Sequence, residues 1–363
     1  MKKLEQLAEL GQSIWYDNIS RALLDSGELE TLIAKGVRGV TSNPSIFENA
    51  IAKTTDYDKE ILAAPKTATA EQVYESLAIQ DIARAADLLL PVYEATRGVD
   101  GYISLEVSPF LAHDTEGTVE AARRLWQIVD RPNLMIKVPA TPDGIAAIRQ
   151  LIAEGINVNV TLLFSVTAYE MVMEAYIEGL EARAEAGFDI DTVHSVASFF
   201  VSRVDSAVDA LLAESGKTAL LGKAGIANAR LAYGSFVKMF KTARWRRLEV
   251  GGANVQRPLW ASTGTKNPDY PDTLYVDQLI GEFTVNTTPP HTLDAFLDHG
   301  TVETTINTYE RARIDMGFIK NAGVSMESVT EKLLNEGVQK FAHAFDGLLA
   351  SVDIKRQVLT GAD

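Results

Sequence analysis

Eight short runs rich in β-branched and aromatic residues recur along this chain, and longer segments with apolar residues at helical spacing separate them. The runs span residues 13–20, 36–44, 99–108, 133–141, 157–164, 194–202, 257–264 and 282–289. The clearest helical segments span 68–95, 118–129, 144–154 and 165–187. This alternation predicts an α/β fold, a (β/α)8 TIM barrel, although a doubly wound sheet has a similar pattern.

Nothing in the sequence divides the chain into parts. No proline-rich or glycine/serine-rich linker, internal repeat or low-complexity stretch interrupts its 363 residues. We therefore expect a single barrel domain over 1–363, with additional helices at the N- and C-termini. The C-terminal helix is expected over about 326–351, where it would pack across the barrel and help to cover its mouth.

The charge of the chain limits its partners. Its 34 Lys+Arg and 49 Asp+Glu give a net charge of −15, which disfavours binding to nucleic acid or to anionic membranes. No apolar run approaches the ~20 residues of a membrane helix, and the first residues lack the apolar core of a signal peptide. We expect a cytoplasmic protein, with both monomer and homodimer open.

Common metal and nucleotide motifs are missing. The chain has no cysteine, and its five histidines lack ligand spacing, so we expect no metal site. Gly216-Lys217-Thr218 resembles the end of a phosphate-binding loop, but Leu211 occupies the place of the required earlier glycine. No GxGxxG, GxSxG or HExxH sequence occurs either.

Two of the expected strands have one polar and one apolar face. In the run from 157, the polar face holds Asn157, Asn159 and Thr161, opposite Val158, Val160 and Leu162. In the run 99–108, the polar face holds Ser104, Glu106 and Ser108. The apolar faces should meet the helices and the polar faces the barrel interior. Because barrel interiors without a site are filled mainly by Val, Ile and Leu, a site is expected at the carboxyl ends of the strands.

Lys137 stands in the middle of the apolar strand 134–139. Lysine is rarely buried and is depleted in strands. A lysine nucleophile reacts as its neutral amine, the form that desolvation favours. The alternative is an edge-strand lysine whose stem covers apolar surface while the ammonium stays in water.

Two carboxylates are expected near the same barrel mouth as Lys137. Asp17 ends the apolar run 14–16, and Glu106 stands within the third predicted strand. Each alone is more often a helix-cap or salt-bridge residue. Beside Lys137 they would form a general acid/base set around an amine nucleophile.

Neutral polar side chains at the strand ends suit a polyhydroxylated substrate. They are Thr41, Asn43, Asn159 and Thr161, with further hydroxyls on Ser198 and Ser262. The sequence around Asn43 is also typical of a strand-to-helix turn with an N-cap, and both interpretations can hold. For an anionic group, the best-placed cations are Arg203 and Lys266, after the sixth and seventh strands. Alternatively, Arg203 pairs with Asp205 or Asp209 of its own helix.

Four segments together resemble the transaldolase family, in its longer bacterial subfamily. They are Thr41-Ser42-Asn43-Pro44-Ser45, Ile136-Lys137-Val138-Pro139-Ala140-Thr141, Asn159-Val160-Thr161-Leu162-Leu163-Phe164-Ser165 and Trp260-Ala261-Ser262-Thr263-Gly264. The match runs in order from Asp17 to the last strand. The resemblance implies a Schiff-base mechanism without a metal or organic cofactor.

The resemblance also implies roles for the three central residues. Lys137 would attack the ketone carbon of fructose 6-phosphate or sedoheptulose 7-phosphate, and Glu106 would act through a water. Asp17 would take the proton of the C4 hydroxyl during C3–C4 cleavage. The dihydroxyacetone unit kept on Lys137 would then pass to erythrose 4-phosphate or glyceraldehyde 3-phosphate, in the non-oxidative pentose phosphate pathway.

The implied binding positions follow the same alignment of motifs. Asn43 and Ser198 match positions that hold the dihydroxyacetone moiety, and Asn159 and Thr161 match positions near the lysine and its water. Arg203 matches a phosphate-binding arginine.

The second phosphate cation departs from the family pattern. Shorter transaldolases carry an arginine two residues after the serine that matches Ser262, and here that residue is Gly264. We assign the role to Lys266, with a distant loop arginine as the alternative. Two other functions stay open, a fructose 6-phosphate aldolase-like lyase and a non-catalytic sugar-phosphate-binding barrel.

Overall fold

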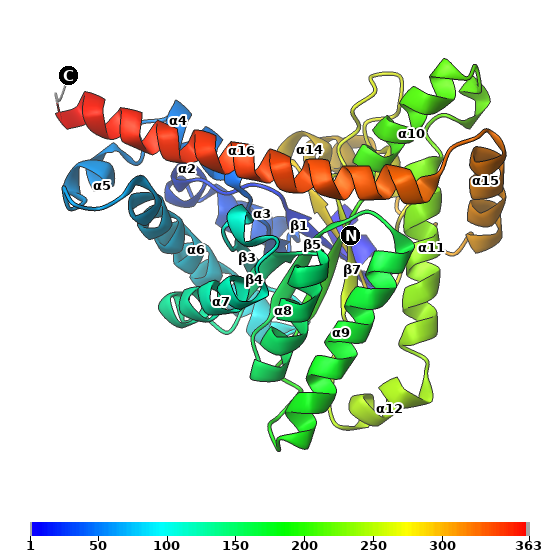
Figure 1. Cartoon of the computed structure of the whole chain (residues 1–363), viewed down its shortest axis with the longest axis horizontal. Helices are drawn as coiled ribbons and strands as arrows, with labels where there is room; N and C mark the ends of the chain where they lie inside the picture. Colours follow the sequence, from blue (N-terminus) through cyan, green and yellow to red (C-terminus); the bar gives the residue numbers. More distant parts are fainter. Residues whose placement is uncertain (1, 361–363) are drawn as a thin grey trace.

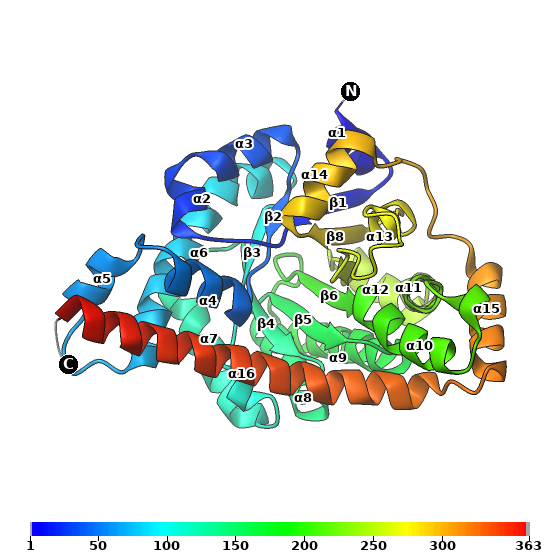
Figure 2. The same cartoon turned by 90° about the horizontal axis from the view of Figure 1, so that it is seen from above.

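Eight parallel strands close into a barrel in chain order, in a computed structural model that describes residues 2–360. Figure 2 shows the strands around the ring. The strands are β1 Gln12–Tyr16, β2 Gly39–Val40, β3 Tyr102–Glu106, β4 Leu134–Pro139, β5 Val158–Leu163, β6 Ser195–Phe200, β7 Arg257–Ala261 and β8 Thr284–Thr288. The predicted TIM barrel is confirmed. β2 is the shortest strand, and Pro44, the last residue of its predicted run, already begins α4.

Helices surround the barrel and extend it at both termini (Figure 1). They are α1 Lys3–Glu9, α2 Arg21–Asp25, α3 Glu28–Lys35, α4 Pro44–Lys53, α5 Asp58–Ala63, α6 Ala70–Ala95, α7 Thr115–Val129, α8 Pro142–Glu154, α9 Val166–Glu185, α10 Ser202–Glu214, α11 Ala224–Met239, α12 Ala243–Val250, α13 Leu274–Asp277, α14 Pro290–His299, α15 Tyr309–Asn321 and α16 Met326–Thr360, with 3-10 turns η1 Pro109–Leu111 and η2 Thr218–Leu220. The four predicted helical segments are α6 to α9. Within residues 2–360, no helix is both long and apolar enough to cross a membrane.

Side-chain caps mark where several helices begin after their strands. The Asn43 side chain accepts a hydrogen bond from the Ile46 N–H, and Pro44 takes the first helical position of α4. Thr141 caps α8 in the same way. A capped helix can follow its strand after a very short turn. Short turns keep the residues after β2 and β4 at the carboxyl-terminal mouth of the barrel.

The amino-terminal half of the barrel interior is filled with large side chains. They belong to Trp15, Tyr102, Met135, Val196, Leu259 and Val285. Trp15 fits because Gly39 has no side chain: a Cβ there would lie 2.6 Å from the indole ring. With this end packed, open space for a substrate is left to the carboxyl-terminal half.

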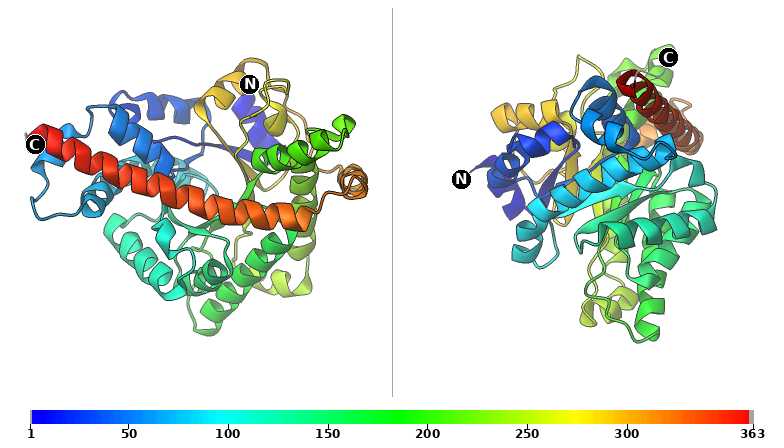
Figure 3. Two further views of the ribbon diagram at one scale, coloured as in Figure 1. Left: turned by 45° about the horizontal axis from the view of Figure 1, so that its top comes forward. Right: turned by 90° about the vertical axis from the view of Figure 1, so that its left-hand side faces the viewer.

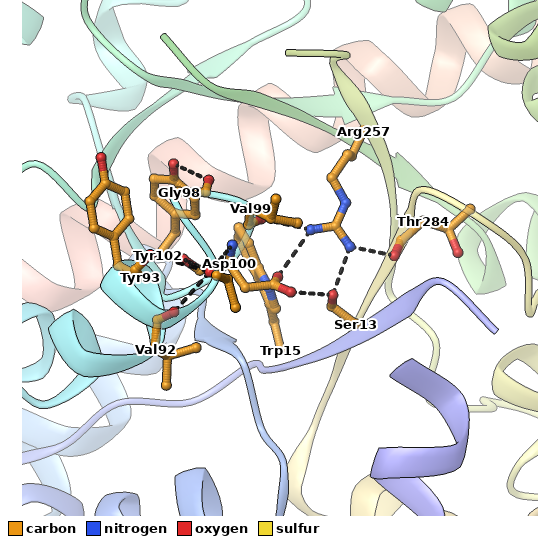
Figure 4. A network of polar contacts seen from close by, with 11 residues as sticks. Ser13, Trp15, Val92, Tyr93, Gly98, Val99, Asp100, Tyr102, Arg257 and Thr284 are labelled. Atoms are coloured by element: carbon orange, nitrogen blue, oxygen red, sulfur yellow. Dashed lines mark hydrogen bonds and ion pairs between the residues drawn. The ribbon is translucent and has the colours of Figure 1, made fainter. Parts of the chain in front are cut away.

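A buried polar network closes the amino-terminal end of the barrel (Figure 4). The Arg257 guanidinium lies 3.0 Å from Asp100 Oδ1 and donates to Ser13 Oγ and to the Thr284 carbonyl oxygen. Asp100 also accepts from Ser13 Oγ and from Trp15 Nε1. The network joins the first residues of β1, β7 and β8 to the loop before β3. It thus ties together segments far apart in the sequence.

Helix α16 crosses the carboxyl-terminal face of the barrel. It packs against α10 and β5, then against α4, α5 and α6, and Figure 3 (left) shows it lying over the ring of elements. The helix predicted over 326–351 is therefore confirmed, and it continues to Thr360. Its last turns are held by Val352, which is buried, and by Lys355, which pairs with Asp58 of α5.

The expected alternation along β5 fails at Leu162. The register with β6 shifts between Val160 and Leu163, and Leu162 has a left-handed φ of 58°. Leu163 takes the helix-facing place, paired with Phe199. The prediction that Leu162 shares a face with Val160 is therefore wrong: the irregularity turns its side chain to the mouth, where it contacts Gly337 of α16.

Candidate active site

The polar residues predicted from the strands meet at the carboxyl-terminal mouth. In the barrel register Glu106 of β3 is beside Lys137 of β4, which is beside Asn159 of β5. Asp17 directly follows β1, where its N–H donates to the Thr288 carbonyl oxygen. The ends of six strands thus meet around Lys137 and Asp17: β1, β3, β4 and β5, together with β2 through Thr41 and β8 through Thr287.

Lys137 is buried inside the barrel, with 5% of its surface exposed. Its Nζ donates to the Ser42 carbonyl oxygen at 3.0 Å and lies 3.4 Å from Glu106 Oε2. Because β4 has a neighbouring strand on each side, the alternative of an edge-strand lysine is wrong. The amine is held out of water, with a carboxylate close enough to exchange a proton with it.

Asp17 is held by a chain of hydroxyl groups. Thr41 Oγ1 donates to Asp17 Oδ1 at 2.7 Å and lies 2.6 Å from Thr287 Oγ1. Burial raises the pKa of the Asp17 carboxyl, while the Thr41 hydrogen bond and the cations Lys137 and Lys266 act in the opposite direction. Thr287 was not predicted from the sequence. It lies on the inward face of β8, next to the strand that leads to Asp17.

Glu106 has the second perturbed carboxyl group of the site. Burial raises its pKa, and the Lys137 ammonium opposes this effect. Glu106 Oε2 and Thr161 Oγ1 are both buried, and neither has a hydrogen-bond partner within residues 2–360. Each therefore keeps hydrogen-bonding capacity for a water or a substrate group.

The remaining neutral residues form a hydrogen-bonded floor around the lysine. Asn159 Nδ2 donates to Ser104 Oγ at 2.8 Å, and Ser198 Oγ donates to Asn159 Oδ1 at 2.7 Å. Asn43 is the N-cap of α4, as the alternative interpretation predicted, and only its Oδ1 is used for this. Its amide NH2 remains able to donate to a ligand.

The predicted phosphate-binding residues line one cavity, between α10 and α16. The cavity has a volume of 710 Å³, and Arg203, Ser262 and Lys266 lie on its wall. Ser262 Oγ lies 2.8 Å from Ser202 Oγ in the first turn of α10. The cavity is thus bounded by the residues that follow β6 and β7, where barrels commonly bind phosphate.

Arg203 packs on aromatic rings and makes no ion pair within its helix. Its Cζ lies 5.1 Å from the Phe200 ring centroid and 5.9 Å from that of Phe341. Asp205 accepts instead from the Gly225 N–H, and Asp209 accepts from Gly222 and Tyr270. The alternative of an intrahelical pair is therefore wrong, and the guanidinium is left for an external anion.

Phe341 of α16 lies at the site but was not predicted from the sequence. Its ring centroid lies 5.8 Å from Lys137 Nζ, and the side chain is buried. An aromatic residue on an amphipathic helix looks like any other core residue, so only the path of α16 reveals its place.

The arrangement combines a buried lysine amine with two carboxyl groups of raised pKa. An amine of this kind can form an imine with a carbonyl carbon, and the carboxyl groups can transfer the protons that imine formation and carbon–carbon cleavage require. The hydroxyl and amide groups around them suit a substrate with several hydroxyl groups. The cavity at Arg203 suits its anionic end.

Known proteins resemble this chain over nearly its whole length. The family profile described as transaldolase/fructose-6-phosphate aldolase matches residues 14–352. A transaldolase of Thermobifida fusca is 52% identical over 96% of this chain and 97% of its own. Transaldolases of Trichodesmium erythraeum and Thiobacillus denitrificans are 49% and 48% identical, over 98% and 97% of this chain and 98% and 100% of theirs. The chain belongs to the transaldolase/fructose-6-phosphate aldolase family.

Proposed function

We propose that this protein is a transaldolase that carries a dihydroxyacetone unit on Lys137. The family assignment supports the reaction, and the single observation that supports the residue is the burial of Lys137 Nζ against Glu106 inside the barrel mouth. The donor is a ketose phosphate, fructose 6-phosphate or sedoheptulose 7-phosphate. The acceptor is an aldose phosphate, erythrose 4-phosphate or glyceraldehyde 3-phosphate, as in the non-oxidative pentose phosphate pathway.

The first steps join the donor to the lysine. Lys137 Nζ attacks the ketone carbon, and the carbinolamine loses water to give the imine. Glu106 moves the protons of these steps through a water. Glu106 Oε2 and Thr161 Oγ1 can bind this water, because neither atom has another hydrogen-bond partner within residues 2–360.

The later steps break the C3–C4 bond of the donor and form a new carbon–carbon bond to the acceptor. Asp17 takes the proton of the C4 hydroxyl, the C3–C4 bond breaks, and an aldose phosphate leaves. The electron pair of that bond remains as an enamine on Lys137. The enamine carbon then attacks the carbonyl carbon of the acceptor, Asp17 returns the proton, and hydrolysis of the new imine releases the product.

The other predicted residues position the sugar. Thr41 orients Asp17, with which it shares a hydrogen bond. Asn43 and Ser198 hold the dihydroxyacetone hydroxyls, and Asn159 lies beside the lysine. Arg203, Ser262 and Lys266 bind the phosphate group. We also infer that the chain is a single domain and works in the cytoplasm.

Borohydride trapping tests the proposal directly. The protein is treated with sodium borohydride in the presence of fructose 6-phosphate, and its intact mass and peptides are then measured. A dihydroxyacetone-sized adduct on Lys137 is the expected result. Its absence from folded protein would leave a sugar-phosphate-binding barrel. Sustained release of free dihydroxyacetone without acceptor would instead favour a fructose 6-phosphate aldolase-like lyase.

A further inference from the structure

The cavity beside Arg203 has a third wall, which α16 supplies. Four cationic side chains line the cavity, against the two carboxylates Glu214 and Glu336. The cations are Arg203, Lys266, Lys332 and Lys340. A positive excess is notable in a chain whose net charge is −15. The cavity therefore concentrates the field that attracts an anion, and part of that field comes from α16.

The two α16 lysines occupy different ends of this wall. Lys340 adjoins Phe341, whose ring lies against both Lys137 and Arg203. Lys332 lies eight residues earlier on the same helix, which at 1.5 Å per residue is about 12 Å farther along the axis. Lys340 is thus the lysine at the end of the wall nearest the reactive amine.

The ion pairs of the two lysines also differ. Lys332 Nζ lies 3.6 Å from Glu336 Oε1, one helical turn away. In the part of the chain from residue 2 to 360, no carboxylate oxygen lies within 4.0 Å of Lys340, Lys266 or Arg203. A phosphate group would therefore meet these three cations without first displacing a carboxylate.

We propose that Lys340 of α16 binds the phosphate group of the sugar phosphates, together with Arg203 and Lys266. The inference rests on the proposed function and extends it to a residue outside the barrel strands and their loops. A sugar phosphate carries close to two negative charges at neutral pH. Its oxygens can accept from Arg203, from Lys266 and from Lys340 on three separate segments, which makes α16 a determinant of specificity for phosphorylated substrates.

The matched pair Lys340→Met and Lys332→Met tests this inference. The half-saturating donor concentration for borohydride trapping on Lys137 is measured with fructose 6-phosphate and with unphosphorylated fructose. Lys340→Met should raise the value for fructose 6-phosphate about tenfold, the usual size of a charge-assisted contact. It should leave the value for fructose unchanged. Lys332→Met should change neither value, and Lys340→Arg should retain most of the wild-type affinity.

Binding of inorganic phosphate supplies a readout that does not need the reaction. The thermal midpoint is measured in phosphate and in sodium chloride of equal ionic strength. Phosphate should stabilise the wild-type protein and Lys332→Met, and should stabilise Lys340→Met much less. Equal stabilisation of all three proteins would overturn the role of Lys340, and so would equal losses with both donors or equal effects of both variants. Failure of the wild-type protein to form the Lys137 adduct would refute the proposed function alone.

Discussion

Phe341 and Lys137 are far apart in the sequence, yet the Phe341 ring centroid lies 5.8 Å from Lys137 Nζ. The ring belongs to α16, which spans the barrel mouth, and the lysine belongs to the middle of β4. The contact places an apolar surface over the amine and beside Arg203. The Lys137 amine is thereby shielded from bulk water on the side that the barrel itself leaves open.

Removing the amine should end the reaction. We expect Lys137→Ala to abolish both transfer activity and the borohydride adduct, because the variant lacks the amine that we propose forms the imine. Initial rates with fructose 6-phosphate and erythrose 4-phosphate measure this. The circular dichroism spectrum provides the control for folding. Activity well above background in the variant would contradict the assigned role.

Replacing Asp17 should separate imine formation from bond cleavage. Asp17→Asn keeps an oxygen for the Thr41 hydroxyl but cannot accept the C4 proton. We expect transfer to fall by about 10²–10⁴-fold, the usual contribution of a general base, while the imine still forms on Lys137. Stopped assays give the rate, and trapping gives the imine. If trapping were lost as well, Asp17 would act before cleavage.

The same variant should alter the pH dependence of stability. Burial raises the pKa of Asp17 in the folded protein, so ionisation of its carboxyl costs stability as the pH rises above the ordinary value of about 3.9. Asp17→Asn removes this cost. We expect the thermal midpoint of the variant to exceed that of the wild type at pH 7. The gain should shrink towards pH 4, and a constant gain would show another cause.

Removing the guanidinium beside the cavity should affect phosphorylated donors selectively. Arg203→Ala should raise KM for fructose 6-phosphate about 30-fold, equivalent to roughly 2 kcal/mol, because a charge-assisted contact is lost. KM for unphosphorylated fructose should hardly change. Steady-state kinetics with both donors give the comparison. Equal changes would place Arg203 outside the phosphate site.

The buried ion pair at the opposite end of the barrel should affect stability alone. Arg257→Ala leaves Asp100 buried without its cation, and we expect a loss of about 3–5 kcal/mol in urea unfolding. The matched control is Arg84→Ala at the exposed Arg84–Asp25 pair, where the loss should be below about 1 kcal/mol. A similar loss of unfolding free energy in both variants would show that burial does not increase the contribution of the Arg257–Asp100 pair to stability. The kcat of folded Arg257→Ala should equal that of the wild type.

Much of this architecture could be predicted because it depends on neighbouring residues. The alternation of strand-type runs and helical segments predicted the barrel, and the two-residue period placed Asn159 and Thr161 on its inner face. The N-cap at Asn43 could also be predicted, since its hydrogen bond reaches only three residues along the chain, to the Ile46 N–H. The convergence of Lys137 and Glu106 followed once the barrel was accepted, because parallel strand ends meet at one mouth.

Other features could not be predicted from local patterns. The irregularity in β5 turns Leu162 towards α16 against the alternation of its strand. Arg257 and Asp100 look like ordinary charged residues until closure of the barrel buries them together. Thr287 gains its place beside Thr41 only because β8 pairs with β1.

The sequence by itself determined the alternation of eight strand-type runs with helical segments, the inward polar residues and the place of Lys137 in the middle of an apolar strand. Only the tertiary structure decided the path that α16 takes over the mouth, which brings Phe341 over Lys137 and places Lys340 on the wall of the cavity of Arg203. The reason is physical. Periodicity and capping reflect interactions within a few residues, whereas the docking of a long helix depends on the shape of a surface that exists only when the barrel has closed.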